Sequence, residues 1–379
     1  MKRIICARVF VRVFSCVVIG LLVFVASMCF YVKRTDNMDF VRIQDLMYPI
    51  RNTNISLYEY LFTNAGKELN QTLNFTYTFN ILLFFTSKLS DNQYILPWLS
   101  AIIDYCVIAS IYYDWKKEQK WSIGETISAF FICMAFLPFV HVLSGIRAAM
   151  AACFMALAVY KYIYRNSSVL FFILFAFLSV TVHPFTVYAV PVALLVRFSP
   201  SIKTFIIVLV GTLALIYIVP ILGRMGIPFV SNLAIKFFTY IGDNQYTSYR
   251  SFYYSSILCA LLLVMYYILF LRTRNKNGII AQKDKLYKFV VCYSAVIIGS
   301  FGSYETVCRL AYVLGALSPI LSEMLLTLWK KDNGRYVIAR IIFFVFLALS
   351  IYTFGKHIRY YGGFFSLGNI AISTNPALQ

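Results

Sequence analysis

Long apolar stretches separated by short polar ones follow one another along almost the whole chain. About 20 apolar residues in a helix are needed to cross the hydrocarbon core of a bilayer. No low-complexity tract, repeat or soluble domain interrupts the series. The pattern predicts about eleven transmembrane helices (10 to 12), at roughly 11–32, 93–113, 123–143, 147–164, 168–182, 184–197, 203–221, 251–271, 287–303, 307–328 and 336–354.

A further apolar stretch, "FTYTFNILLFFTSKL" at 75–89, is short and contains Thr, Asn and Ser. It is either a twelfth span or a helix that dips into the membrane or lies along its surface. The predicted fold class is therefore all-α, a polytopic transmembrane helical bundle, with residues 1–379 forming a single integral membrane domain.

Composition agrees with this class. The 379 residues are 61% hydrophobic and 13% charged, with a mean hydropathy of +0.75, which is more apolar surface than one soluble core could bury. A net charge of +19 would suggest nucleic acid as a partner of a soluble protein, but here most cations occupy short loops between apolar stretches. We expect membrane lipids and no nucleic acid as partners.

The basic loops also predict the orientation, because positive loops stay in the cytoplasm. If 75–89 does not cross, most Lys and Arg residues fall on one side, including the basic 272–288 loop; if it crosses, that loop faces outward. The first arrangement puts the N-terminus in the cytoplasm, with an uncleaved first span, and the C-terminus outside. Its longer outer segments are 33–74 and 222–250.

Several polar residues then meet at the outer membrane boundary. Arg147 and Arg309 stand near the outer ends of their spans, His183 ends a span, and Arg34 and Asp39 follow the first span. Each also has a structural interpretation: arginines at helix ends reach the headgroups, and a histidine before a proline can form hydrogen bonds at a helix break.

The functional interpretation rests on the chemistry of these groups. A guanidinium group stays charged and matches phosphate oxygens in a bidentate fork, so arginines here suit a lipid-linked diphosphate. Histidine exchanges a proton near neutral pH. The tyrosine-rich segment 236–254 offers flat rings for sugars, at Tyr246 and Tyr249. Nine cysteines without C-x-x-C spacing and three histidines indicate neither a metal site nor a cofactor.

Four motifs carry a resemblance to a known family. "SGIRAAMAACFMALAVYKYI" followed by "HPFTVYAVP", with "RTDNMDF" (Arg34 and Asp39 in R-x4-D) and "CRLAYVL" (Arg309 and Tyr312 in R-x-x-Y), resembles the EpsG family of Wzy-type polysaccharide polymerases. The resemblance extends from about residue 30 to 330. The family often has a glycine where Met38 stands and a Glu-Pro pair where "LNFTYTF" stands, so no catalytic role is assigned to 55–80.

The resemblance implies a metal-independent enzyme of the bacterial inner membrane that joins undecaprenyl-diphosphate-linked oligosaccharide repeat units for O-antigen, capsule or exopolysaccharide. Arg147, Arg309 and Arg34 would bind the diphosphate, His183 or Asp39 would serve as the base, and Tyr246, Tyr249 and Tyr312 would contact sugar. A chain-length regulator and a flippase are the implied partners.

Two other functions fit parts of the pattern. A membrane glycosyltransferase that uses lipid-monophosphate sugars would carry acidic residues in the first outer loop, where Asp36 and Asp39 lie. A flippase or transporter of lipid-linked sugars would place charges along the bundle interior, whereas Asp104 is a rare charge in the middle of a span.

Overall fold

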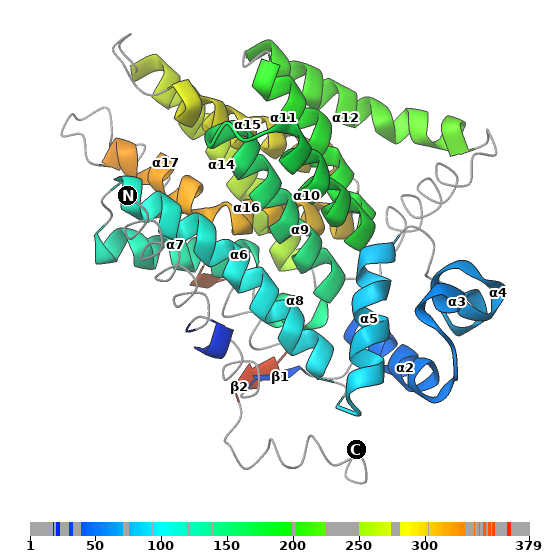
Figure 1. Cartoon of the computed structure of the whole chain (residues 1–379). Coiled ribbons are helices and arrows are strands. Elements are labelled where there is room, and N and C mark those ends of the chain that lie inside the picture. The colour runs from blue at the N-terminus through cyan, green and yellow to red at the C-terminus, as the bar shows by residue number, and fades with distance from the viewer. Residues whose placement is uncertain are drawn as a thin grey trace.

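A computed structural model of the chain describes the parts on which the following sections rest. These are residues 39–70, 76–92, 94–119, 122–137, 139–198, 202–223, 250–273, 281–301 and 303–329, with short pieces at 18, 20–22, 30–32, 337, 341, 344–345, 348–349, 351–352 and 362–364. Almost all of the described residues are helical (Figure 1), which confirms the helical fold class.

The main body is a bundle of apolar helices around α9 (Ile146–Val159), which continues into a short π-helix, η1 (Tyr160–Tyr164). All residues of α9 except Arg147, Phe154 and Leu157 are buried. The helix is rich in alanine, and small side chains let neighbouring helices approach closely. It packs against α6 (Ile95–Gln119), α10 (Val169–Val182) and α16 (Tyr304–Ala316).

The remaining helices pack against these helices or against one another (Figure 1). They are α7 (Ile123–Phe136), α8 (Phe139–Ser144), the 3-10 helix η2 (Pro184–Tyr188), α11 (Ala189–Phe198), α12 (Ile202–Gly223), α14 (Arg250–Thr273), α15 (Ala281–Gly299) and α17 (Ser318–Trp329).

The helices of the bundle differ in length relative to the thickness of a membrane. Two helical stretches in the described part of the chain, Ile95–Lys117 and Ile146–Tyr164, are long and apolar enough to span a bilayer by length and composition. Among the other apolar helices, α10 with 14 residues rises about 21 Å, less than the roughly 30 Å hydrocarbon core, while α12 with 22 and α14 with 24 residues are longer. The count of about eleven spans therefore stays a prediction.

A separate layer of shorter helices lies at one end of the bundle (Figure 1). It consists of α2 (Asp39–Asn52), α3 (Leu57–Phe62), α4 (Asn64–Leu69) and α5 (Tyr77–Leu89). Arg51 Nε donates to the carbonyl of Ser87 (3.0 Å), and Lys88 Nζ donates to that of Thr53 (2.7 Å). These bonds join the ends of α2 and α5, where cations suit exposed helix carbonyls.

The ambiguous stretch at 75–89 forms helix α5. Its 13 residues rise about 20 Å, less than the roughly 30 Å hydrocarbon core. It packs against α2 and α3 and meets α10 through a hydrogen bond between the hydroxyls of Thr78 and Thr181, 2.7 Å apart. Helix α10, an expected span, rises about as far, so the arrangement in which this stretch does not cross stays a prediction.

A two-stranded antiparallel pairing departs from the all-helical prediction. Strand β1 (Phe30–Val32) pairs with β2 (Gly362–Phe364), with Tyr31 opposite Gly363. The first expected span, 11–32, is therefore wrong at its end, because its aromatic and β-branched residues adopt an extended conformation. The pairing brings the end of the first expected span and the C-terminal segment to one place.

Candidate functional site

The crossing of α9 and α10 brings Arg147 and His183 to the same end of the bundle. The two helices are antiparallel, with Tyr162 stacked on Phe172 at one end, ring centroids 4.5 Å apart. Nearer the other end, Ser179 Oγ donates to the carbonyl of Ala151 at 2.6 Å. Arg147 precedes Ala151 by one turn, and His183 follows Ser179 by one turn. Both residues therefore lie one turn beyond this contact, at what we call the Arg147 end.

Arg147 occupies the first turn of α9, directly after Ile146 and the N-cap residue Gly145. Its guanidinium carbon lies 5.7 Å from the centroid of the Phe79 ring in α5, a cation–π distance. A cation in the first turn opposes the helix macrodipole, so helix stability does not favour this position. A negatively charged ligand would offset that unfavourable interaction.

His183 ends α10 and begins η2, with Pro184 as the first residue of the new helix. Its Nδ1 accepts a hydrogen bond from the Phe185 backbone N–H at 3.4 Å, and its carbonyl accepts one from Thr186 Oγ1 at 3.1 Å. A neutral imidazole whose Nδ1 is an acceptor carries its proton on Nε2. In this geometry Nε2 is a hydrogen-bond donor.

Arg309 stands on α16 at the same end. It forms an ion pair with Glu305 one turn earlier, and the two side chains are 18% and 16% exposed. Helix η2 packs against both α9 and α16. The turn that carries His183 thus lies beside both arginine-bearing helices.

A buried pair, His141 and Tyr312, connects these helices and was missed at the sequence level. His141 Nδ1 lies 2.5 Å from Tyr312 Oη, and both residues are buried. The carbonyl of His141 also accepts from the N–H of Gly145, the N-cap of α9, at 2.8 Å. One residue of α8 therefore joins the start of α9 to α16, close to Arg309.

Tyr312 was predicted as a sugar contact from its R-x-x-Y motif. In the structure its ring is 4% exposed and its hydroxyl is engaged with His141. The sugar contact stays a prediction, while the geometry shows a link between helices. The sequence signal for that link is slight: a histidine six residues before Arg147, on the far side of a glycine.

The other predicted site residues are less fully placed. Asp39 is the first residue of α2, which packs near α8. Arg34, Tyr246 and Tyr249 lie outside the described residues. Within the described ranges, no group of three or more His, Cys, Asp or Glu side chains is arranged to hold a metal ion.

The described part of the chain is a bundle of apolar helices, and two helical stretches in it are long and apolar enough to span a membrane. The chain matches the EpsG family model over residues 45–366, most of its length, and it belongs to the EpsG family, whose proteins are Wzy-type polymerase-like. Comparison with curated proteins and with solved structures gave no match. Membership confirms the resemblance and indicates a role in polysaccharide biosynthesis, a polymerase type of function and a membrane location. The match includes Arg147, His183 and Arg309 and begins after Arg34 and Asp39.

Proposed function

We propose that this protein is the polymerase that joins undecaprenyl-diphosphate-linked oligosaccharide repeat units on the outer face of the bacterial inner membrane, for O-antigen, capsule or exopolysaccharide. The observation that carries the proposal is the convergence of Arg147, His183 and the helix of Arg309 at one end of the bundle. Two fixed cations and a donor at the same level suit a diphosphate group.

The reaction transfers the growing chain to the next unit. A hydroxyl oxygen of the incoming lipid-linked unit attacks the anomeric carbon of the growing chain, and the bond from that carbon to the phosphate oxygen breaks. Undecaprenyl diphosphate leaves with the electron pair. Arg147 and Arg309 stabilise the negative charge that develops on the leaving diphosphate, as preorganised groups do most effectively. No nucleotide sugar or metal takes part.

The proton of the attacking hydroxyl needs an acceptor. With Nδ1 of His183 occupied by the Phe185 N–H, the ring presents an Nε2–H donor, which suits a phosphate oxygen better than a hydroxyl proton. We therefore assign His183 to the diphosphate and Asp39, at the start of α2, to the base. Arg34 is a further phosphate contact, and Tyr246 and Tyr249 contact sugar.

The proposed orientation keeps the N-terminus in the cytoplasm, with about eleven spans. Asp114 at the end of α6 pairs with Lys161 and Arg165 at the end of η1, so the predicted cytoplasmic loops after these helices lie at one end of the bundle. This supports the proposal, since the Arg147 end then faces outward. A flippase that delivers the lipid-linked units and a chain-length regulator are the proposed partners.

A strain that lacks this protein tests the function, with the glycans on the lipid carrier analysed by mass spectrometry. We expect complete single repeats on the outer face and no polymer, restored by the parent protein but not by Arg147→Ala produced at the same level. Repeats that lack one sugar would instead show a glycosyltransferase. Complete repeats retained on the cytoplasmic face would show a flippase, and either result would overturn the proposal.

A further inference from the structure

Three aromatic side chains form a continuous exposed surface on the α2–α5 layer. Tyr58 and Phe62 of α3 and Tyr77 of α5 are 71%, 59% and 40% exposed. Ring centroids of Tyr58 and Phe62 lie 5.4 Å apart, and those of Phe62 and Tyr77 lie 6.1 Å apart with an interplanar angle of 25°. We call these three residues the aromatic row. Adjoining exposed rings from two helices are unlike the scattered apolar residues of an ordinary surface.

The aromatic row is held by a buried polar network beneath it. Asn70 Nδ2 donates to Tyr60 Oη and to Asn80 Oδ1, both at 3.0 Å, and Asn80 Nδ2 donates to Thr76 Oγ1 at 2.9 Å. Burial raises the pKa of Tyr60 to about 12, so its hydroxyl stays neutral at physiological pH. The network fixes α3 against the start of α5, and satisfied buried networks of this kind make a surface rigid.

A close approach of two short helices reinforces this arrangement. A Cβ atom on Gly66 of α4 would lie 1.8 Å from the carbonyl oxygen of Tyr60, so no larger residue fits without separating α3 from α4. The three rings are therefore positioned before any ligand arrives, which lowers the entropy lost on binding.

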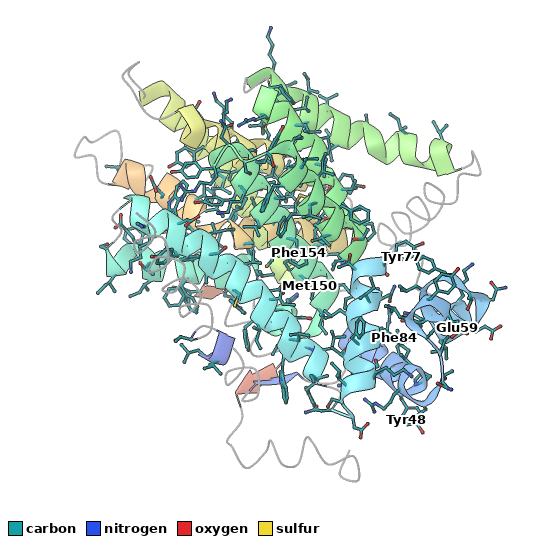
Figure 2. All side chains as sticks on the ribbon, viewed as in Figure 1. Tyr48, Glu59, Tyr77, Phe84, Met150 and Phe154 are labelled. Atoms are coloured by element: carbon teal, nitrogen blue, oxygen red, sulfur yellow. The ribbon has the colours of Figure 1, made fainter. Side chains whose placement is uncertain are left out.

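One end of the aromatic row adjoins the proposed diphosphate site. Tyr77 directly precedes Thr78, whose hydroxyl lies 2.7 Å from that of Thr181, two residues before His183. Phe79, over which the Arg147 guanidinium lies, is buried on the opposite side of α5 in the same turn. Figure 2 shows Tyr77 at the end of α5 nearest the bundle and Glu59 on the neighbouring short helices. A ligand that extends from the Arg147 end past the start of α5 would meet Tyr77 before Phe62 and Tyr58.

The surroundings of the aromatic row suit a hydrated ligand rather than hydrocarbon. Glu59, Lys67 and Glu68 on the same short helices are exposed. The Glu59 carboxylate accepts hydrogen bonds from the backbone N–H and the hydroxyl of Ser56. These two bonds, the backbone one most, hold the pKa of the carboxyl below its usual value, so it is ionised at neutral pH. Inserting an ionised carboxylate into hydrocarbon is strongly unfavourable. Aromatic rings beside polar groups match sugars, which present flat C–H faces and hydroxyls.

We infer that Tyr58, Phe62 and Tyr77 bind the oligosaccharide of the lipid-linked substrate, with the sugars nearest the diphosphate at Tyr77 and later sugars at Phe62 and Tyr58. The inference rests on the proposed function and adds a sugar-binding surface to the site. It assigns a role to α3 and α5 that the sequence motifs of the family did not indicate.

The test uses the purified full chain in lipid nanodiscs. The probe is the lipid-free oligosaccharide repeat released by mild acid from the lipid-linked pool of the producing strain, and binding is measured by saturation-transfer NMR. We expect Tyr58→Ala, Phe62→Ala and Tyr77→Ala each to weaken binding about fivefold, the factor given by an aromatic contact of ordinary strength. Tyr48→Ala is the matched control, since Tyr48 is 69% exposed on α2, apart from Tyr77 in Figure 2; it should leave binding unchanged.

Two further variants distinguish sugar binding at the aromatic row from loss of catalysis and from contact with lipid. Arg147→Ala should still bind the lipid-free oligosaccharide while it abolishes polymer, so loss of activity alone leaves the sugar-binding inference standing. Phe62→Trp reports on contact with lipid: indole fluorescence quenched by brominated acyl chains, together with unchanged sugar binding in the three alanine variants, would show a membrane contact and overturn the inference. Sugar-dependent fluorescence without bromine quenching supports it.

Discussion

The two ends of α9 use their cations differently. At one end, which we call the Asp114 end, Lys161 Nζ and Arg165 Nη2 lie 3.0 and 3.3 Å from Asp114 Oδ2, and this carboxylate is only 6% exposed. The Arg165 guanidinium also lies over the ring of Tyr164, at 5.5 Å. At the other end, Arg147 lies over Phe79, beside the turn of His183 and the helix of Arg309.

We expect the charges at the Asp114 end to hold helices together and those at the Arg147 end to bind a ligand. At the Asp114 end, a nearly buried carboxylate joins α6 to η1, so removing a partner leaves a charge without compensation. At the Arg147 end, the arginine opposes the dipole of its own helix and adjoins the aromatic row. The first end should therefore respond to substitution mainly in stability, and the second mainly in activity.

Matched Arg→Lys substitutions at the two ends give the largest expected contrast. Arg147→Lys keeps the positive charge but loses the bidentate fork, and we expect elongation to fall about a hundredfold or more, as when a preorganised donor is removed. Arg165→Lys should change the rate less than about twofold. The measurement is the initial rate of polymer formation from lipid-linked repeats in nanodiscs. Equal losses in the two variants would contradict the distinction.

Asp114→Asn should instead lower stability and leave the rate of polymer formation unchanged. It leaves Lys161 and Arg165 beside a neutral amide, and because both cations are about 30% exposed we expect a loss of about 2 kcal/mol rather than the larger cost of a fully buried pair. Thermal unfolding in detergent measures the loss, and the rate per folded molecule should stay at the parent value. An unchanged melting temperature would show that the ion cluster contributes little.

The sequence predicts some bundle helices closely because their limits are local, whereas the stretches expected at 123–143 and 307–328 each form two helices, α7 with α8 and α16 with α17. The stretch expected at 147–164 corresponds to Ile146–Tyr164, and that expected at 168–182 corresponds to α10, Val169–Val182. Gly145, Ser168 and the His183–Pro184 pair mark these boundaries, and each acts through its own cap or backbone geometry. The short helices α2–α4, within the segment expected as an outer loop, depend instead on contacts with α5, which periodicity does not report.

The residues of the candidate site also divide into those that the sequence places and those that it does not. Arg147 and His183 could be placed at one end from span boundaries alone, because that requires only helix order. The bond between His141 and Tyr312 joins residues 171 positions apart, and the contact between Phe62 and Tyr77 joins two separate helices, α3 and α5. Such pairs depend on how helices pack, and a single sequence carries no record of that.

The smallest expected effects test whether His141 and Tyr312 position the Arg147 end. Tyr312→Phe removes the hydroxyl that meets His141 Nδ1 and should lower stability by about 1 kcal/mol, with kcat reduced several-fold and KM nearly unchanged, because the arginine-bearing helices lose a shared anchor. The double variant with His141→Phe should lose less than the sum of the two single variants, since both remove one interaction.

Tyr112→Phe is the matched control for this prediction. Tyr112 Oη lies 3.2 Å from Ser318 Oγ, so the variant also removes a part-buried interhelical hydroxyl contact, but near Asp114. We expect a stability loss of similar size, about 1 kcal/mol, and an unchanged kcat. If both tyrosine variants reduce kcat equally, the hydroxyls act only through overall stability, and the Arg147 end has no special dependence on His141. If only Tyr312→Phe reduces it, the packing of α8 sets the position of the groups that bind the diphosphate.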